Sequence, residues 1–360
     1  MKNLVTGGAG FLGTHLVTEL LARGEPVRVL ERPGAVVDHL PLDKIELVFS
    51  DIRDSATVQR ATTGCNSVYH LAADPNLWRR DRQEFDAVNH LGTINVMEAA
   101  VQSGAQRILH TSTESILSSA DFKGGSVEHL KLKEEDMIGP YCLSKFRAEQ
   151  AVQRMIEKGI PIVIVTPTLP VGPGDRNQTP PTRMAVAFCR GELPAYLDCR
   201  FNLVDARDVA QGMVRAMERG RPGIRYLLGG ANYRLHEWLQ ILGRAAGRKA
   251  PRWKVPFGLA LTVGWLSELW ADYVTGRMPM ATLTGVRLAR RCMYFDPAPS
   301  LAELGLKPRS IQESARDAVT WYREQGWIPP GSPPGASATE QKSGKAERRS
   351  RTRLTMVTKP

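Results

Sequence analysis

Short runs of β-branched and apolar residues alternate with amphipathic segments from Lys2 to about Gly172. The runs predict strands over residues 4–6, 27–30, 45–49, 67–71, 107–111 and 161–165. The segments between them predict helices over residues 11–23, 55–61, 84–104 and 141–158. Strands that alternate with helices of this length indicate βαβ units and an α/β fold, with a doubly wound parallel sheet covered on both faces.

The alternation loosens after Gly172, where several prolines interrupt the chain. Helical stretches recur over residues 208–219, 235–246, 257–274 and 311–325. We therefore predict a core domain over 1–172 and a smaller, mostly helical substrate-binding region over 173–328 that partly re-enters the core. Residues 329–360 are rich in Pro, Gly and Ser and then basic, which predicts a disordered tail because few apolar side chains offset its ordering entropy.

The charge of the chain is unevenly distributed. The formal net charge is +11, but residues 331–360 alone carry seven basic and two acidic side chains. The mild basic excess of the remainder suits an anionic cofactor or a small-molecule substrate and does not indicate nucleic acid.

Cysteine usage and hydropathy limit the compartment. The five cysteines form no C-x-x-C pair, which favours reduced thiols over disulfides or a metal site. No signal peptide is expected, and the apolar run Phe257–Trp265 is too short to span a bilayer. We expect a cytoplasmic protein, and a membrane-peripheral location stays open.

Three glycines follow the first predicted strand and open the first helix: Gly7, Gly10 and Gly13. The turn needs backbone freedom, and a pyrophosphate needs close approach to main-chain N–H groups at a helix N-terminus. The strand–turn–helix context makes this G-x-x-G-x-x-G a dinucleotide-binding motif. Glu31 and Arg32 end the second strand, where a carboxylate selects the 2′-hydroxyl of NAD and an arginine selects the 2′-phosphate of NADP. We predict NAD(P), with NAD slightly favoured because Glu31 is nearer the strand end.

Later strand ends extend this predicted site. Asp51 and Ile52 suit the adenine, and the small residues of His70–Ala73 let the chain pass beside the cofactor. For His70 itself we favour a hydrogen-bonded core role over catalysis. The full set expected at the cofactor is Gly7, Gly10, Phe11, Leu12, Gly13, Glu31, Arg32, Asp51, Ile52, Leu71, Ala72, Ala73, Tyr141, Lys145 and Pro167.

A catalytic group is predicted at the carboxyl ends of the strands. Tyr141 and Lys145 are four residues apart and share one helix face, while Thr113 follows the fifth strand. A phenol titrates near 10, so a base acting near neutrality needs a pKa lowered by roughly three units. We expect Lys145, together with the positive charge of oxidised nicotinamide, to lower it. We expect Thr113 to orient the substrate oxygen and Tyr141 to act as acid/base at a secondary alcohol.

These residues resemble the extended short-chain dehydrogenase/reductase family, also called NAD-dependent epimerases/dehydratases, over roughly residues 1–328. Within it the chain is most similar to hopanoid-associated sugar epimerases and dihydroflavonol-4-reductase-like proteins. The resemblance rests on TGGAGFLG (6–13), SDIRD (50–54), HLAA (70–73), HTST (110–113), DMIGPYCLSKFRAEQ (136–150), TPTLPVGPGD (166–175) and FNLVDARDVAQG (201–212). It implies a Rossmann core, tightly bound NAD(P) and an active triad of Thr113, Tyr141 and Lys145. It also implies an assisting role for Ser112 and a structural role for Asn89.

Two departures from the family pattern bear on the reaction. Glu114-Ser115 stands where the 4,6-dehydratases carry Asp-Glu, which argues against water elimination. Thr166-Pro167 stands where many epimerases carry Asn-Pro, which weakens the assignment of a nucleotide-sugar substrate.

The substrate side leaves three hypotheses open. The first is an epimerase acting on a nucleotide- or lipid-linked sugar, with Arg183, Arg200 and Arg287 as candidate phosphate ligands. The second is a reductase of a polycyclic or lipid alcohol, similar to dihydroflavonol 4-reductase or 3β-hydroxysteroid dehydrogenase. The third is a non-catalytic NAD(P)-sensing regulator. The aromatic segment Pro256–Met280 suits an apolar substrate pocket, a weak membrane-surface contact or plain core packing, and a homodimer also stays open.

Overall fold

A parallel seven-stranded sheet forms the centre of the computed structural model, which describes residues 2–117, 119, 122–127, 130 and 132–330. Its order is β10-β6-β5-β4-β1-β2-β3, so the chain starts in the interior, winds to one edge and then crosses to the other. This is the doubly wound Rossmann arrangement, with a crevice where the order reverses between β1 and β4. The strands are β1 (Asn3–Thr6), β2 (Val27–Glu31), β3 (Ile45–Phe49), β4 (Ser67–His70), β5 (Arg107–Thr111), β6 (Ile162–Pro167) and β10 (Arg225–Leu228).

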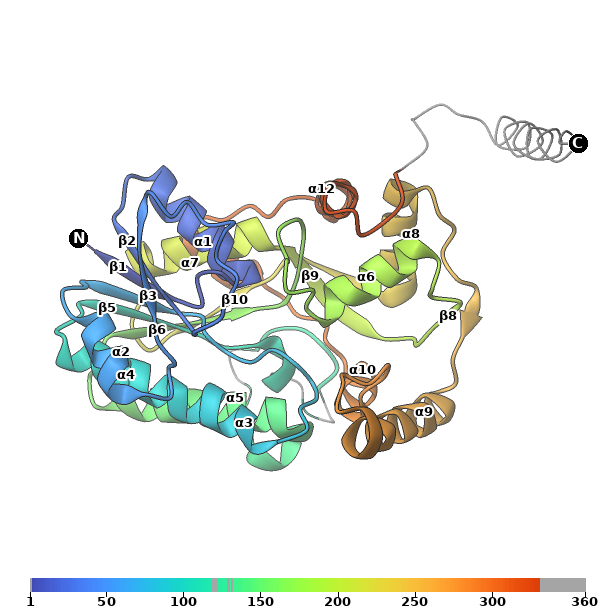
Figure 1. Ribbon diagram of the computed structural model, residues 1–360, viewed down its shortest axis with the longest axis horizontal. Helices are drawn as coiled ribbons and strands as arrows, with labels where there is room; N and C mark the ends of the chain where they lie inside the picture. Colours follow the sequence, from blue (N-terminus) through green and yellow to red (C-terminus); the bar gives the residue numbers. More distant parts are fainter. Residues whose placement is uncertain (1, 118, 120–121, 128–129, 131, 331–360) are drawn as a thin grey trace, which may run out of the picture.

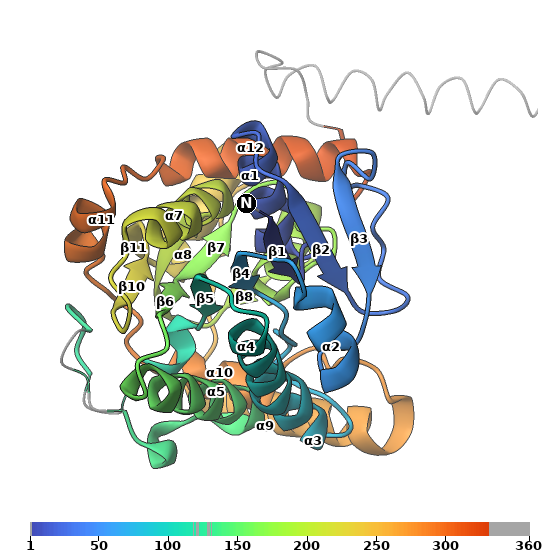
Figure 2. The same cartoon turned by 90° about the vertical axis from the view of Figure 1, so that its left-hand side faces the viewer.

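Helices cover both faces of this sheet (Figure 2). One face carries α1 (Phe11–Ala22) and α7 (Ala206–Arg219), which pack against each other. The other face carries α2 (Ser55–Thr62), α4 (Gly92–Gln102) and α5 (Gly139–Glu157). Strand residues such as Leu4, Val5 and Ile164 are fully buried, as the continuous apolar runs predict for a sheet covered on both sides.

The helix predicted over 84–104 is interrupted. The structure has a short α3 (Gln83–Phe85), a π-helical turn η1 (Asp86–Leu91) and then α4. Asn89 lies in that turn and is completely buried. Its amide carbonyl accepts from the N–H of Asp74 at 2.7 Å, and its amide nitrogen donates to the Asp74 carbonyl at 3.2 Å. The periodicity of apolar residues predicts one continuous helix because it does not reflect these tertiary hydrogen bonds.

The second half of the chain contains more strands than the sequence predicts. A three-stranded sheet joins β7 (Leu169–Val171), β9 (Arg200–Asp205) and β11 (Ala231–Arg234), and β8 (Ala195–Tyr196) pairs with β12 (Trp253–Lys254). Apart from β9, these strands have two to four residues, too few to establish the alternation of apolar and polar residues that predicts a strand. The helices are α6 (Pro180–Arg190), α8 (Leu235–Ala246), α9 (Phe257–Trp270), α10 (Leu283–Ala289), α11 (Ala298–Leu304) and α12 (Ile311–Glu324), with a π-helical turn η4 (Ala271–Thr275) continuing α9.

The two halves are intertwined through the central sheet. β10 pairs in parallel with β6 and α7 packs on α1, so residues after 172 contribute to the same core. Figure 1 shows the central sheet at one end of the molecule and α8, β12 and α9 at the other. Across the described residues, no helix combines the length and the hydropathy that a bilayer crossing requires. Residues 331–360, most of the predicted tail, lie outside the described part.

Candidate active site

The glycine turn between β1 and α1 has the geometry that a dinucleotide requires. Gly7 has a φ of +72°, in the left-handed region that favours glycine. A Cβ on Gly7 would lie 2.9 Å from the backbone of Ala72, and a Cβ on Gly13 would lie 2.0 Å from the Gly7 carbonyl oxygen. A Cβ on Gly10 would meet only that same oxygen, at 3.2 Å. Gly7 and Gly13 therefore close the turn, while Gly10 leaves the space in front of it open.

The start of α1 is suited to an anionic ligand. Gly10 is the N-cap, and within the described residues no side chain caps this helix or places an acid in its first turn. The first N–H groups of the helix, from Phe11 and Leu12 onward, have no intrahelical partner. Together with the helix dipole they form a site that fits the pyrophosphate of NAD(P).

Glu31 lies against this turn. Its carboxylate accepts a hydrogen bond from the backbone N–H of Ala9 at 2.6 Å, and the side chain is buried. Burial raises the pKa of Glu31, and the hydrogen bond from Ala9 opposes that rise. Arg32 is exposed. The structure thus brings the carboxylate, and not the guanidinium, to the glycine turn.

The other expected cofactor residues occupy the adjoining strand ends. Ile52 is buried and packs on Gly92 of α4, where an added Cβ would lie 2.7 Å from the Ile52 Cδ1. Asp51 is held by Arg53, whose Nη2 lies 2.7 Å away, and this contact lowers the pKa of the carboxyl. Leu71–Ala73 follow β4 directly in front of Gly7, and Pro167 ends β6.

His70 has both ring nitrogens occupied. Nδ1 lies 2.8 Å from the Thr6 hydroxyl and Nε2 lies 2.9 Å from the Thr93 hydroxyl. Burial lowers its pKa to about 3, so the ring stays neutral. These contacts join β1, β4 and α4 and agree with the structural role expected for this residue.

The three predicted catalytic side chains come from two neighbouring elements. Thr113 follows β5 and caps the 3₁₀ turn η2 (Glu114–Ile116) through a hydrogen bond from the N–H of Ser115 at 3.3 Å. Tyr141 and Lys145 lie on α5. The Lys145 ammonium donates to the Thr111 carbonyl at 2.8 Å, which fixes α5 to the end of β5. The predicted group therefore gathers at the carboxyl edge of the sheet.

Burial has the largest influence on the pKa of the Tyr141 phenol in this structure. Burial raises the pKa of Tyr141 above its ordinary value, and the neighbouring Glu114 carboxylate adds to that rise. The side chain that opposes the rise most is Thr113, not Lys145. Lys145 is itself buried, and desolvation lowers its pKa to about 8. The Lys145 ammonium is directed at the Thr111 carbonyl of β5. The lowering of the phenol pKa by Lys145 together with oxidised nicotinamide stays a prediction.

Glu114 lies beside the predicted catalytic side chains. The sequence does not reveal whether its carboxyl group is protonated. The Thr113 hydroxyl donates to its carboxylate at 3.2 Å. Burial raises the pKa of Glu114 to about 7. The sequence shows a carboxylate after the threonine, but its burial depends on how α5 and η2 pack together.

Two networks of polar contacts hold α5, the helix that carries Tyr141 and Lys145, against its neighbours. Asn89 donates to the Ser144 hydroxyl at 3.1 Å, and Ser144 donates to the Tyr141 carbonyl at 2.8 Å. Ser112 donates to the buried Glu149 carboxylate, which also pairs with Arg225 on β10. Ser112 thus joins the end of β5 to α5 through Glu149, and the assisting role that the family resemblance implies stays a prediction.

The second half of the chain contacts the start of α5 through α10, on which α9 packs. Gly139 begins α5 with a φ of +75°, and a Cβ there would lie 2.3 Å from the Thr284 Oγ1 on α10. α10 therefore sits directly on the helix start that carries Tyr141. The candidate phosphate ligands Arg183, Arg200 and Arg287 lie on three separate elements, α6, β9 and α10.

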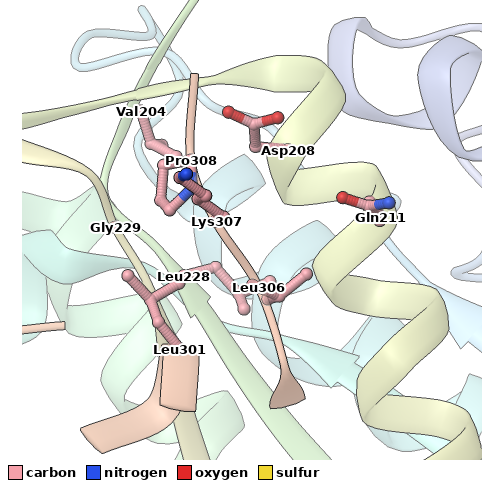
Figure 3. A pocket seen from close by; sticks show the side chains of 9 residues that line it. All are labelled: Val204, Asp208, Gln211, Leu228, Gly229, Leu301, Leu306, Lys307 and Pro308. Carbon is pink, nitrogen blue, oxygen red and sulfur yellow. The ribbon is translucent and has the colours of Figure 1, made fainter. Parts of the chain in front are cut away.

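A small, partly open pocket of about 10 Å³ lies between α7, β10 and the segment that follows α11 (Figure 3). Its lining includes Asp208, Leu228 and Lys307. A space of this size holds about one water molecule. It is separate from the group around Tyr141 and is too small for a substrate.

The chain matches the model of the NAD dependent epimerase/dehydratase family over residues 3–229. It is 36% identical over 328 residues to a putative dihydroflavonol 4-reductase of Synechocystis, covering 90% of this chain and 95% of that protein. It is 33% identical over 329 residues to sterol demethylase protein B of Methylococcus capsulatus, covering 91% of this chain and 100% of that protein.

A solved structure supports the same relationship. The crystal structure of gox2253 superposes with a TM-score of 0.79 at 35% identity, covering 91% of this chain and 99% of that one. The matched region includes the glycine turn, Thr113, Tyr141 and Lys145. The fold, the turn geometry and these matches together show that the chain belongs to the NAD-dependent epimerase/dehydratase family.

Proposed function

We propose that this protein is a reductase or dehydrogenase that acts on a bulky, apolar secondary alcohol or ketone, of the polycyclic or lipid class. The observation that carries the proposal is the wall beside the catalytic tyrosine: α10 rests on Gly139, and α9 packs on α10. α10, the helix of this wall that contacts the start of α5, has one charged residue, Arg287, in its seven residues. A wall of this composition favours an apolar substrate over a nucleotide sugar.

Membership of the family makes the chain an NAD(P)-dependent enzyme, and the regulator hypothesis is set aside. We infer the substrate class from the names of two relatives, since flavonoid and sterol skeletons are both polycyclic. We assign residues 1–172 to the cofactor and 173–328 to the substrate. Because the Glu31 carboxylate faces the glycine turn, we also propose that NAD is preferred over NADP.

The proposed mechanism gives each side chain one task. The nicotinamide supplies or accepts the hydride. Tyr141 donates its phenolic proton to the ketone oxygen during reduction and takes it back during oxidation. Thr113 holds that oxygen by a hydrogen bond, and Lys145, one helical turn from the phenol, stabilises the phenolate. Glu149 favours the charged form of Lys145.

The test compares cofactor use on three substrate classes. Purified protein is incubated with NADH or NADPH and a 3-ketosteroid, a dihydroflavonol or a nucleotide sugar, while absorbance at the reduced nicotinamide is followed. We expect one cofactor to be consumed for each polycyclic ketone reduced. Conversion of the nucleotide sugar with no added cofactor, and none of the polycyclic ketones, would overturn the proposal.

The epimerase hypothesis rests on the basic residues of the substrate half. Arg200 starts β9, and its guanidinium carbon lies 5.9 Å from the centre of the Tyr294 ring. An arginine stacked on an aromatic ring is held in place for a phosphate. An epimerase retains its cofactor, so NAD(P) extracted from the purified protein in a one-to-one ratio would favour this alternative.

Two further partner expectations stay proposals. A homodimer is tested by light scattering of the purified chain. A weak association with a membrane surface is supported by the exposed aromatic residues of α9 and η4.

A further inference from the structure

An exposed apolar face runs along α9 and η4. Large side chains on this segment are between 53% and 81% exposed: Leu259, Trp265, Leu266, Trp270, Tyr273 and Val274. We call these six residues the docking face. Leu259, Leu266, Trp270 and Tyr273 recur at helical spacing, so they form one stripe. A contiguous apolar stripe of this kind marks an interaction surface, whereas single exposed residues do not.

The two acids of this segment point away from the docking face. Glu268 accepts from the backbone N–H of Leu283 at 2.8 Å and is 12% exposed. Asp272 accepts from the Trp78 indole N–H at 3.0 Å and from Arg82 at 3.1 Å. The carboxylates thus anchor the segment to the body and leave its outer face without negative charge.

The chain that leads into α9 is strongly basic. Residues 244–254 contain five basic residues and no acidic one. Arg244, Arg248, Lys249 and Arg252 are exposed and line a surface groove of about 630 Å³ at the end of α8. Figure 1 shows α8, β12 and α9 at the same end of the molecule, opposite the central sheet.

We propose that this end of the protein docks on an anionic phospholipid bilayer, with the docking face in the interface and the basic groove against lipid phosphates. Trp and Tyr favour the membrane–water interface, and Lys and Arg are attracted to anionic headgroups. α9 has 14 residues, fewer than the roughly 20 that cross a bilayer, so it lies in the plane of the surface. Charge complementarity favours the bilayer over a second copy of this chain, whose face would carry the same charge.

The docking face is one helix away from the catalytic tyrosine. A Cβ on Gly264 of α9 would lie 3.5 Å from the Val286 side chain on α10, and Thr284 of the same helix contacts Gly139. α10 therefore separates the docking face from the start of α5, so docking would hold the site near the bilayer surface. The delivery of an apolar substrate from that surface rests on the proposed function, whereas membrane docking does not.

The experiment uses full-length protein and sedimentation with vesicles of neutral phosphatidylcholine, with or without 30% phosphatidylglycerol. The test variant is W265S/W270S/Y273S. The matched control, L42S/F49S/V101S, removes three exposed apolar side chains from the cofactor half. Circular dichroism and NADH binding verify that each variant is folded.

We expect wild type and the control to sediment with the anionic vesicles and the test variant to bind at least about tenfold more weakly. Binding should weaken with salt and with neutral vesicles. Equal sedimentation of the test variant and wild type would overturn the proposal. Absence of vesicle binding by wild type would also overturn it. Light scattering that shows a dimer in wild type and none in the test variant would then assign the docking face to a second copy of the chain. No substrate is present, so these outcomes are independent of the turnover assay.

Discussion

The cofactor half, residues 1–172, and the substrate half, residues 173–328, differ in where their large exposed apolar side chains lie. Among described residues 2–172 the exposed ones are scattered over loops, β3, η1 and α4: Val36, Leu42, Phe49, Leu91 and Val101. In the substrate half, nine of them fall between Trp253 and Met280. The sheet has helices on both faces to bury its residues, whereas α9 has a partner on one side only. Cofactor binding thus uses closed packing and precise backbone contacts, while the substrate side keeps an apolar surface open.

The largest effect should come from the phenol at the boundary between the halves. Tyr141→Phe removes the transferable proton, and we expect turnover to fall by about 10² to 10⁴ fold. The dissociation constant of the cofactor, measured by NADH fluorescence, should stay within about twofold. Tyr273→Phe, on the docking face, is the matched control and should keep wild-type turnover with a water-soluble ketone. Unchanged turnover in Tyr141→Phe would remove this residue from the mechanism.

Glycine replacements test the difference in packing. Gly13→Ala places a methyl group 2.0 Å from the Gly7 carbonyl, so the turn must move. We expect a loss of about 3 kcal/mol of unfolding free energy and of cofactor binding. Gly258→Ala on α9 meets no atom within 4 Å and should be neutral or stabilising by up to about 1 kcal/mol. Chemical denaturation measures both, and equal destabilisation would contradict the contrast between the halves.

Cofactor selection should depend on Glu31. Glu31→Gln removes the charge that faces the glycine turn, and we expect NADH to bind about tenfold more weakly, equivalent to about 1.4 kcal/mol. NADPH should bind more tightly because repulsion of the 2′-phosphate is lost. Arg32→Gln provides the comparison and should weaken NADPH binding only. A Glu31→Gln variant with unchanged selectivity would show that the ribose is recognised elsewhere.

The smallest effect should be a pH dependence of stability from Glu114. Its raised pKa of about 7 means that the folded state binds this proton more tightly than the unfolded state. The resulting stabilisation is fully present below the ordinary pKa near 4.5 and is lost as the pH rises through 7. Between pH 6 and 7, wild type should lose about 1 kcal/mol more than Glu114→Gln. Parallel pH profiles of the two proteins in urea denaturation would contradict this.

Much of the site could be predicted from local sequence because its geometry is local. The glycine turn, Glu31 at the end of β2 and the Tyr141–Lys145 spacing each depend on one strand or one helix. Parallel topology then places the strand ends at a common edge. Features that depend on packing between distant segments were not predicted, such as the π-helical turn around Asn89, the strands β7, β9 and β11, and the contact of Gly139 with α10.

The sequence by itself determined the α/β class and the cofactor type, and it predicts the catalytic residues, because periodicity and short motifs encode these features within a few residues. Only the tertiary structure decided the ionisation of those residues. Burial raises the pKa of Tyr141 and Glu114 and lowers that of Lys145, and burial depends on segments far away in the chain. It also decided which apolar residues stay exposed, since a helix pattern shows an apolar face but not whether a neighbour covers it.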